Sequence, residues 1–186
     1  MKLKIFENYL EMSAAAADLV IEIVSDKPNA VLCFATGNTP VLTYQLLAEK
    51  ANTKKIDFSK CFFIGLDEWL GIPPGKNGSC HHSLVQQVFQ PLKITASQVH
   101  LFDAMTTDIE LECKRMNDKI NEKGGIDFML VGIGINGHIG FNEPGVDIGL
   151  SSHEQELHET TLSSGKKYFH EVTMIKRNGA EREGST

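Results

Sequence analysis

The chain has 186 residues, of which 41% are hydrophobic and 23% are charged, values typical of a globular protein with one sizeable core. Its formal net charge of −6 argues against broad binding to nucleic acid or to an anionic membrane, although a few backbone N–H groups can still hold a small anion. No apolar run reaches the roughly 20 residues of a membrane span, and the N-terminus lacks a signal-peptide pattern. We therefore expect a cytoplasmic protein with no nucleic-acid or membrane partner.

The four cysteines are widely spaced and include no C-x-x-C motif. Cys33 and Cys61 lie in apolar runs that are typical of buried strands. This pattern favours reduced thiols over a disulfide framework or a zinc site. His81 and His82 are adjacent, so they cannot easily share one ion, and a solvated helix start is the alternative explanation for them. We expect no metal.

Apolar runs alternate with amphipathic stretches along the chain. A short edge strand is predicted at residues 1–6, and a helix begins at Tyr9 and is stopped by residues 26–29. Continuously apolar runs, typical of strands buried on both faces, occupy residues 30–35, 61–66 and 126–134. A further strand is predicted at 98–102, and further helices at 41–51, 83–92 and 108–125. This alternation predicts an α/β fold, Rossmann-like, with a mostly parallel sheet flanked by helices.

The polar residues that stand out follow three of the predicted strands. The motifs are ATGNTP at 35–40, LDEWLG at 66–71 and GINGHIGFNEPG at 134–145. In sheets of this kind, ligands bind beyond the carboxyl ends of the strands. The three loops therefore predict one shared active site.

The ATGNTP loop has the composition of a phosphate cradle. Gly37 can adopt backbone angles that are closed to other residues, while Thr36, Asn38 and Thr39 add donors. The unpaired N–H groups of the next helix, with Pro40 expected at its first position, carry partial positive charge. A plain strand-to-helix turn with a threonine N-cap is the alternative. The motif is not a P-loop, because the lysine of that motif is missing.

Two adjacent acids, Asp67 and Glu68, follow the predicted strand 61–66, and their side chains should point to different sides. A carboxylate that is partly removed from water has a raised pKa and can act as a general base. Alternatively, such an acid caps a helix or binds backbone N–H groups. The pattern alone leaves both interpretations open.

The third motif, which we name the histidine loop (residues 134–145), holds His138 and Glu143 among four glycines. Histidine takes up and releases protons near neutral pH, and Glu143 can accept a hydrogen bond from the imidazole and fix its tautomer. A lone loop histidine is usually a surface residue. Because a carboxylate, amides and glycines accompany this one, we favour a functional role in which Glu143 orients His138.

Together the three motifs resemble the glucosamine-6-phosphate deaminase family, also called glucosamine/galactosamine-6-phosphate isomerases. The resemblance covers roughly residues 1–169. The histidine loop continues with FNEP after its Gly-His pair, which the related 6-phosphogluconolactonases usually lack. The segment KPNAVLCFATGNTPVLTY, together with LDEW, is similar to the galactosamine-6-phosphate branch of the family. The resemblance implies an enzyme of amino-sugar and carbohydrate metabolism, with isomerase and hydrolase character and no cofactor. Such an enzyme opens the ring of an amino-sugar 6-phosphate, moves a proton between C2 and C1, and releases ammonia from a ketose 6-phosphate.

The family's roles carry over by position. Asp67 falls at the base for enolisation, His138 at the ring-opening acid/base and Glu143 at its orienting carboxylate. Asn136 falls where members have Asp or Asn, so it is expected to orient rather than to transfer a proton. The implied substrate-binding residues are Thr36, Gly37, Asn38, Thr39, Gly137 and Lys167, the last at the place of a family arginine.

The C-terminal stretch departs from the family pattern. The family's chains normally continue with a further strand–helix portion, which residues 170–186 do not match. We therefore expect one domain at 1–169, without the family's last strand–helix portion, and a divergent, irregular tail at 170–186. An unpaired sheet edge with exposed apolar surface would invite partners, and the resemblance itself implies a homo-oligomer.

Two alternatives stay open for the function, since the early end of the chain leaves its activity unsettled. One is a lactonase of the same fold that hydrolyses 6-phosphogluconolactone. The other is a truncated sugar-phosphate-binding remnant with little activity. Ammonia release would select the deaminase, whereas stabilisation by sugar phosphate without turnover would select the binding remnant.

Overall fold

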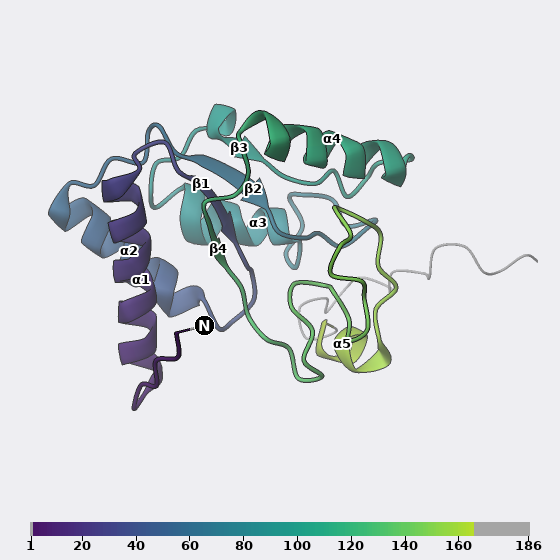
Figure 1. Cartoon of the computed structure of the whole chain (residues 1–186), viewed down its shortest axis with the longest axis horizontal. Helices are drawn as coiled ribbons and strands as arrows, with labels where there is room; N and C mark the ends of the chain where they lie inside the picture. Colours follow the sequence, from purple (N-terminus) through teal and green to yellow (C-terminus); the bar gives the residue numbers. More distant parts are fainter. Residues whose placement is uncertain (1, 166–186) are drawn as a thin grey trace, which may run out of the picture.

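The computed structural model describes residues 2–165, which form a four-stranded parallel sheet with the strand order β3-β2-β1-β4 (Figure 1). The strands are β1 (Val31–Phe34), β2 (Phe62–Gly65), β3 (Val99–His100) and β4 (Phe128–Leu130). The predicted α/β class with a parallel sheet is therefore confirmed. Lys167 and the tail 170–186 lie outside the described residues, so the domain boundary stays a prediction.

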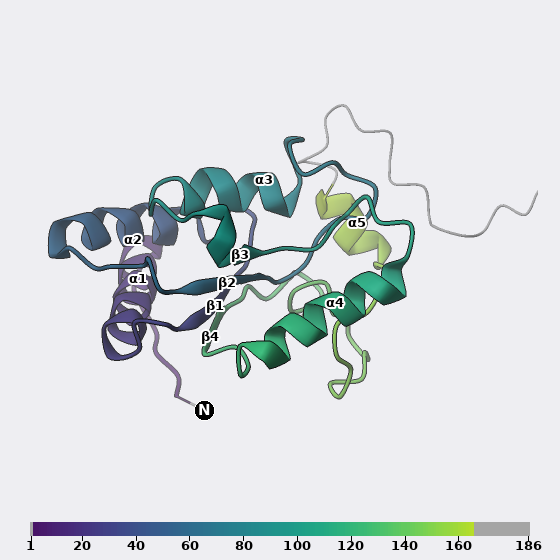
Figure 2. The ribbon, with the colours of Figure 1, turned by 90° about the horizontal axis from the view of Figure 1, so that it is seen from above.

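Helices cover both faces of the sheet. They are α1 (Tyr9–Asp26), α2 (Val41–Lys54), α3 (Cys80–Leu84), the π-helix η1 (Val85–Phe89), the 3-10 helix η2 (Ala96–Gln98), α4 (Ile109–Glu122) and α5 (Glu159–Gly165). Seen from above, the strands run between α3 and α4 (Figure 2). The main core joins α1, α2, α3 and η1 to one face, and a smaller cluster joins α4 to the other.

Local sequence explains how α1 begins and packs. The Asn8 side chain accepts a hydrogen bond from the Glu11 N–H over 2.9 Å, which satisfies one of the unpaired donors at the helix start. Small and branched residues at three- and four-residue spacings then form one buried face: Ser13, Ala17, Val20, Ile21 and Val24. Lys50 Nζ lies 2.6 Å from Asp18 Oδ2 and ties α2 to α1 on the surface.

The main core holds the carboxyl halves of β1 and β2 in place. All four residues of β1 are buried, as the continuous apolar run predicts. The Phe63 ring lies 5.9 Å from that of Phe34 and 5.4 Å from that of Phe89, centroid to centroid. Burying each ring contributes about 1.5–3 kcal/mol. The loops that follow these strands therefore leave from a rigid base.

The strand order reverses between β1 and β4. From β1 the chain passes through α2 to β2 on one side, whereas β4 pairs with the other side of β1. The Ala35 N–H donates a hydrogen bond to the Leu130 carbonyl over 2.9 Å. The ATGNTP loop and the chain leading to the histidine loop therefore depart side by side, at the point where open α/β sheets bind ligands.

The predicted edge strand at residues 1–6 is wrong. Residues 2–6 form neither helix nor strand, and Leu3 and Ile5 are 76% and 87% exposed. The alternation of apolar and polar residues is present, but a strand also needs a neighbour for its backbone hydrogen bonds. Within the described part of the chain, this segment joins no ladder.

The prediction that residues 126–134 form a strand buried on both faces is also wrong. Only Phe128–Leu130 pair with β1, at the edge of the sheet, and Met129 is 44% exposed. Phe128 and Leu130 pack against the main core. Met129 shares the opposite face with Cys33, its neighbour in the register, and lines a cavity there with Cys113 and Ile120 of α4. Within residues 2–165, this edge of the sheet is unpaired and Met129 on it is exposed.

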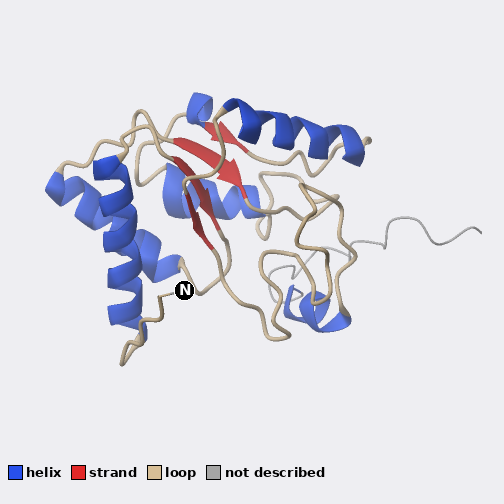
Figure 3. Cartoon of the chain, viewed as in Figure 1, coloured by secondary structure: helices blue, strands red, loops and turns tan. Residues whose placement is uncertain are grey.

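Loops dominate the second half of the described chain. After β4, residues 131–158 contain isolated bridges and turns until α5 begins (Figure 3). Among residues 2–165, no helix has the length and apolar character needed to cross a bilayer.

Candidate functional site

The ATGNTP loop is open at the start of α2. Pro40 occupies the N-cap position and makes no side-chain cap hydrogen bond, so the alternative of a threonine N-cap is wrong. Gly37 has a φ of 99°, the left-handed region expected for it. The Tyr9 hydroxyl donates to the Thr39 carbonyl over 2.7 Å and accepts from the Leu42 N–H over 3.2 Å. Tyr9 therefore steadies the loop from α1, and the side chains of Asn38 and Thr39 stay exposed.

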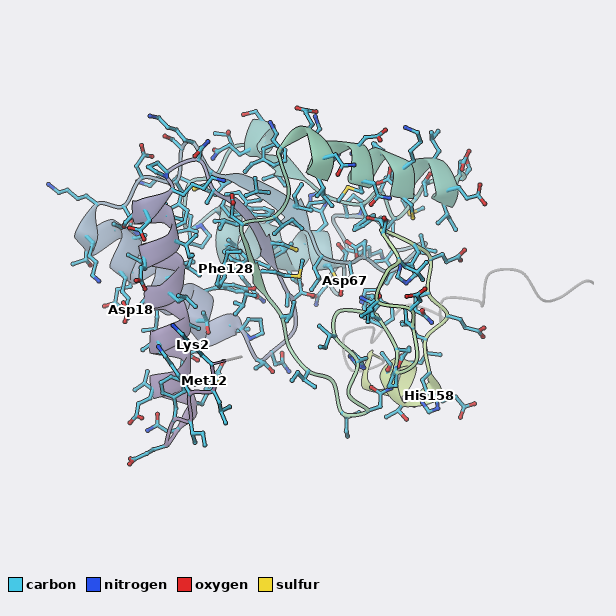
Figure 4. The ribbon with its side chains drawn as sticks, viewed as in Figure 1. Lys2, Met12, Asp18, Asp67, Phe128 and His158 are labelled. Carbon is cyan, nitrogen blue, oxygen red and sulfur yellow. The ribbon has the colours of Figure 1, made fainter. Side chains whose placement is uncertain are left out.

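Asp67 leaves the end of β2 and faces the histidine loop. A β-carbon on Gly140 would lie 3.6 Å from Asp67 Oδ2, while the Cys80 thiol donates to Oδ1 over 3.5 Å. Burial raises the pKa of the Asp67 carboxyl to about 6, and the thiol hydrogen bond partly offsets this. Asp67 is thus a carboxylate whose pKa suits a general base near neutral pH. Figure 4 labels it where the sheet gives way to the loops.

Glu68 binds the start of α3 instead of facing the histidine loop. Its Oε1 accepts from the Cys80 N–H over 2.9 Å, and its Oε2 accepts from the His81 N–H over 2.8 Å and from the Ser79 hydroxyl over 3.2 Å. These donors open α3, so Glu68 binds a helix start. The LDEW motif left two interpretations open, a general base and a helix cap. The contacts of Asp67 fit the first, and those of Glu68 fit the second. His81 and His82 lie in the first turn of α3, as the alternative explanation for them expects, but both are half-buried rather than solvated.

The histidine loop folds back on itself in a narrow hairpin. The Gly134 N–H donates to the His138 carbonyl over 2.8 Å, and the Gly137 N–H donates to the Gly134 carbonyl over 2.9 Å. Gly137 has a φ of 89°, which a side chain would make unfavourable. The hairpin places the imidazole of His138 directly over Gly134, where a β-carbon would lie only 2.0 Å from the ring.

The prediction that Glu143 contacts His138 directly is corrected by the structure. Asn136 Oδ1 lies 2.6 Å from His138 Nδ1, and Asn136 Nδ2 donates to Glu143 Oε2 over 2.6 Å. Because the amide nitrogen faces the carboxylate, its oxygen must face the imidazole. His138 Nδ1 then carries the proton, which leaves Nε2 as the basic nitrogen. The reason for the error is that an amide inserted between two partners cannot be deduced from spacing.

Residues of the 158–161 segment complete this network and were not predicted. Thr161 Oγ1 lies 3.2 Å from His138 Nδ1, and the His158 N–H donates to Glu143 Oε1 over 2.9 Å. Figure 4 labels His158 beside α5. Burial alone would raise the pKa of the Glu143 carboxyl, but hydrogen bonds led by that from Thr161 hold it below its usual value. Glu143 is therefore an anion, and the sequence signal for Thr161 was only a hydroxyl at an ordinary helix start.

The LDEW segment and the histidine loop meet through their aromatic residues. The rings of Trp69 and Phe141 lie 4.5 Å apart, centroid to centroid, in an edge-to-face arrangement. A cavity of about 870 Å³ opens beside them, and its lining includes Asp67, Ile139 and Asn142. Of the predicted catalytic residues, Asp67 lies on the cavity wall, whereas Asn136, His138 and Glu143 form one hydrogen-bonded unit in the neighbouring loop.

Comparison with known proteins gives consistent relatives. The family described as glucosamine-6-phosphate isomerases/6-phosphogluconolactonase matches residues 7–142. The glucosamine-6-phosphate deaminase of Thermoanaerobacter sp. (strain X514) is 39% identical over 177 residues, which cover 95% of this chain and 70% of the relative. The putative deaminase AgaI of Escherichia coli (strain K12) is 37% identical over 174 residues, with 90% and 69% covered.

Solved structures agree. One described as a monomeric glucosamine-6-phosphate deaminase of the NagB superfamily matches with a TM-score of 0.88 at 34% identity, over 91% of this chain and 70% of that one. A 6-phosphogluconolactonase from Thermotoga maritima matches with a TM-score of 0.61 at 23% identity, over 73% and 60% of the two chains, and shows a common fold alone. The chain belongs to the glucosamine-6-phosphate isomerase/6-phosphogluconolactonase family.

Proposed function

We propose that this protein is an amino-sugar-6-phosphate deaminase, which converts glucosamine- or galactosamine-6-phosphate to a ketose 6-phosphate and ammonia. One observation carries the proposal: a carboxylate with a pKa of about 6, Asp67, faces a loop that holds an oriented histidine. The relatives described as glucosamine-6-phosphate deaminases support the substrate class.

Ring opening is assigned to His138. The anomeric hydroxyl must lose a proton and the ring oxygen must gain one, and an imidazole with one free nitrogen can do both in turn. The contacts that Asn136 and Thr161 make at Nδ1 support Nε2 as the nitrogen that acts on the sugar. Glu143 contributes by fixing the orientation of Asn136.

Proton transfer is assigned to Asp67. Its carboxylate takes the proton from C2 of the open aldose and returns it to C1. The C1 oxygen gains a proton and the nitrogen on C2 loses one, so that the amino group on C2 becomes an imine. Water adds to this imine, the C–N bond breaks, and ammonia leaves a ketone at C2. The net reaction consumes one water, which gives the isomerisation its hydrolytic character. The proposal requires no metal or organic cofactor.

The ATGNTP loop is assigned to the 6-phosphate. Thr36, Gly37, Asn38 and Thr39 lie before the start of α2, whose partial positive charge favours an anion. Gly137, in the turn beside His138, is proposed to leave room for the sugar. Lys167 remains part of the proposal by resemblance alone.

The setting of the enzyme is also proposed. The four cysteines are free thiols, which supports a cytoplasmic location. A small sugar phosphate is the proposed partner, with no role for nucleic acid or membrane. The homo-oligomer implied by the resemblance stays a prediction, and one related deaminase is described as monomeric.

A substrate panel tests the function. The purified chain is mixed separately with glucosamine-6-phosphate, galactosamine-6-phosphate and 6-phosphogluconolactone, and ammonia and acid release are followed. We expect ammonia from an amino-sugar phosphate in equal amount to ketose phosphate. Acid release from the lactone without ammonia would select the lactonase. Thermal stabilisation by the sugar phosphates without any turnover would select a binding protein.

A further inference from the structure

Cys80 lies between two parts of the proposed site that come from different loops. The Thr36 hydroxyl of the ATGNTP loop donates to Cys80 Sγ over 3.2 Å, and the Cys80 thiol donates to Asp67 Oδ1 over 3.5 Å. The cysteine is 3% exposed. Three residues far apart in the sequence thus form one directed chain of hydrogen bonds, from hydroxyl to thiol to carboxylate.

The chemistry of the thiol fits a donor rather than a nucleophile. Burial, together with the nearby carboxylates of Asp67 and Glu68, raises the pKa of Cys80 well above its usual value. The sulfur therefore keeps its proton and has it available for Asp67. Since Oδ1 is held by the thiol, Oδ2 is the oxygen that faces Gly140 of the histidine loop.

The position of Cys80 is itself fixed from the LDEW segment. Its backbone N–H donates to Glu68 Oε1 over 2.9 Å, and the buried Ser79 side chain caps the same helix by accepting from the His82 N–H over 3.0 Å. Asp67 and Glu68 are adjacent, so one acid holds the helix start that carries the thiol and the other receives the thiol's hydrogen bond. This closed arrangement leaves the carboxylate of Asp67 little freedom to rotate.

We propose that Cys80 is a positioning residue for the deamination, which holds the Asp67 carboxylate in its productive orientation and connects it to Thr36 of the phosphate loop. The inference rests on the proposed function and adds to it a residue that lies outside all three sequence motifs. Its role is to orient one oxygen of the base and to stabilise the base in its charged form.

The groups around Asp67 make the effect on protonation measurable. Burial and the charge of Glu68 raise the pKa of Asp67, and the Cys80 hydrogen bond lowers it. Among residues 2–165, Cys33 on β1 and Tyr44 on α2 also interact with this carboxyl, and both stay neutral because burial raises their pKa values. Removing the thiol removes the influence from this part of the chain that lowers the pKa of Asp67, and should therefore raise that pKa.

The test compares Cys80→Ala and Cys80→Ser in the full chain, with Cys61→Ala as the matched control. Cys61 is equally buried, and its thiol donates to the Pro28 carbonyl, away from the site. For Cys80→Ala we expect kcat for ammonia release to fall about 10-fold with little change in KM. We also expect the apparent pKa of the acid limb of the pH–rate profile to rise by about 0.5. Cys80→Ser keeps a donor, so its kcat and its apparent pKa should stay close to those of wild type, and Cys61→Ala should change neither quantity.

A second readout does not depend on turnover. The carbon-13 shift of the Asp67 carboxyl, followed from acid to alkaline pH, reports its titration directly. We expect a higher midpoint in Cys80→Ala than in wild type or Cys80→Ser. Either of two results would overturn the inference: an unchanged midpoint in folded Cys80→Ala, or an equal loss of kcat in the alanine and serine variants. If wild type released no ammonia, the proposed function would fail while this titration still decided the role of Cys80.

A third variant covers a failure of Cys80→Ala to fold. Thr36→Val removes only the hydroxyl that donates to the sulfur, which weakens the thiol as a donor. We expect its Asp67 midpoint to move in the same direction by a smaller amount. A midpoint identical to that of wild type would overturn the link between Thr36 and Asp67.

Discussion

The side-chain amide of Asn136 lies between Glu143 and His138, with its nitrogen 2.6 Å from Glu143 Oε2 and its oxygen 2.6 Å from His138 Nδ1. The carboxylate therefore acts on the imidazole through the amide. An amide can flip, and its orientation helps to decide which nitrogen of His138 carries the proton. Glu143 opposes the flip from one side, and the His138 N–H, which donates to Asn136 Oδ1 over 3.3 Å, opposes it from the other.

Glu143→Gln tests this relay. The glutamine can keep its oxygen toward the His158 N–H and turn its nitrogen toward Asn136. Asn136 then flips, losing the hydrogen bond from the His138 N–H, and presents its own nitrogen to the imidazole. We expect the imidazole proton to move from Nδ1 to Nε2 and kcat to fall about 10- to 100-fold, because general acid–base catalysis contributes about 10²–10⁴. Nitrogen-15 shifts of His138 report the tautomer. An unchanged tautomer in an inactive variant would contradict the relay.

Gly134 and Gly132 provide a matched pair of alanine substitutions. A β-carbon on Gly134 would lie 2.0 Å from His138 Cε1, whereas one on Gly132 meets nothing within 4 Å. Neither glycine has a positive φ, so backbone strain does not separate them. We expect Gly134→Ala to displace the imidazole and reduce kcat at least 100-fold, with Gly132→Ala near wild type. Equal activities in the two variants would show that His138 does not occupy this position.

Asp67 is expected to lower stability at neutral pH. Because burial raises its pKa to about 6, the folded state favours the protonated acid. Its stabilising contribution is complete below the unfolded-state pKa near 4 and is lost as the pH rises through about 6. Asp67→Asn should therefore exceed wild type by on the order of 1–3 kcal/mol in free energy of unfolding at pH 8 and match it near pH 4.

Urea unfolding at the two pH values measures this difference. Glu49→Gln, at an exposed position inside α2, serves as the control for replacing a carboxyl by an amide. A gain for Asp67→Asn that is the same at both pH values would indicate that the ionisation of Asp67 is not its cause.

Glu68 is expected to matter for stability more than for chemistry. Glu68→Ala leaves the N–H groups of Cys80 and His81 without their acceptor at the start of α3. We expect a loss of about 2–4 kcal/mol in the free energy of unfolding, from hydrogen bonds to a charged group. Glu49→Ala, at an exposed position of α2, should stay within about 0.5 kcal/mol of wild type. A Glu68→Ala protein as stable as wild type would refute the capping role.

The sequence predicts the fold well where the pattern is continuous. The runs that became β1 and β2 are continuously apolar, and every residue of the two strands is buried except Phe62, which is half-buried. The same interpretation of apolar pattern was wrong for β4 and for residues 2–6. An apolar pattern indicates which side chains favour burial, but it does not say which element will cover them. Partners in a sheet are a tertiary property.

The candidate site was likewise predictable in part. That Asp67, His138 and Glu143 belong together was predictable, since glycines and carboxyl-end loops concentrate them. An orienting role for Asn136 was also predicted, but its place between Glu143 and His138 was not. The donor Thr161 and the thiol of Cys80 were not predicted, because each acts through a hydrogen bond to a segment distant in the sequence. The two adjacent acids could be separated only once α3 was seen to begin beside Glu68.

The assignment of Asp67 as the base is the central claim, and kcat/KM for ammonia release tests it most directly, measured for wild type and Asp67→Asn across pH 5 to 9. In wild type the rate should rise with pH through about 6, the pKa of this carboxyl, because the base must be ionised. Asp67→Asn, shown to be folded, should lose about 1,000-fold or more at every pH. A variant that keeps a rate within a few-fold of wild type would contradict the account.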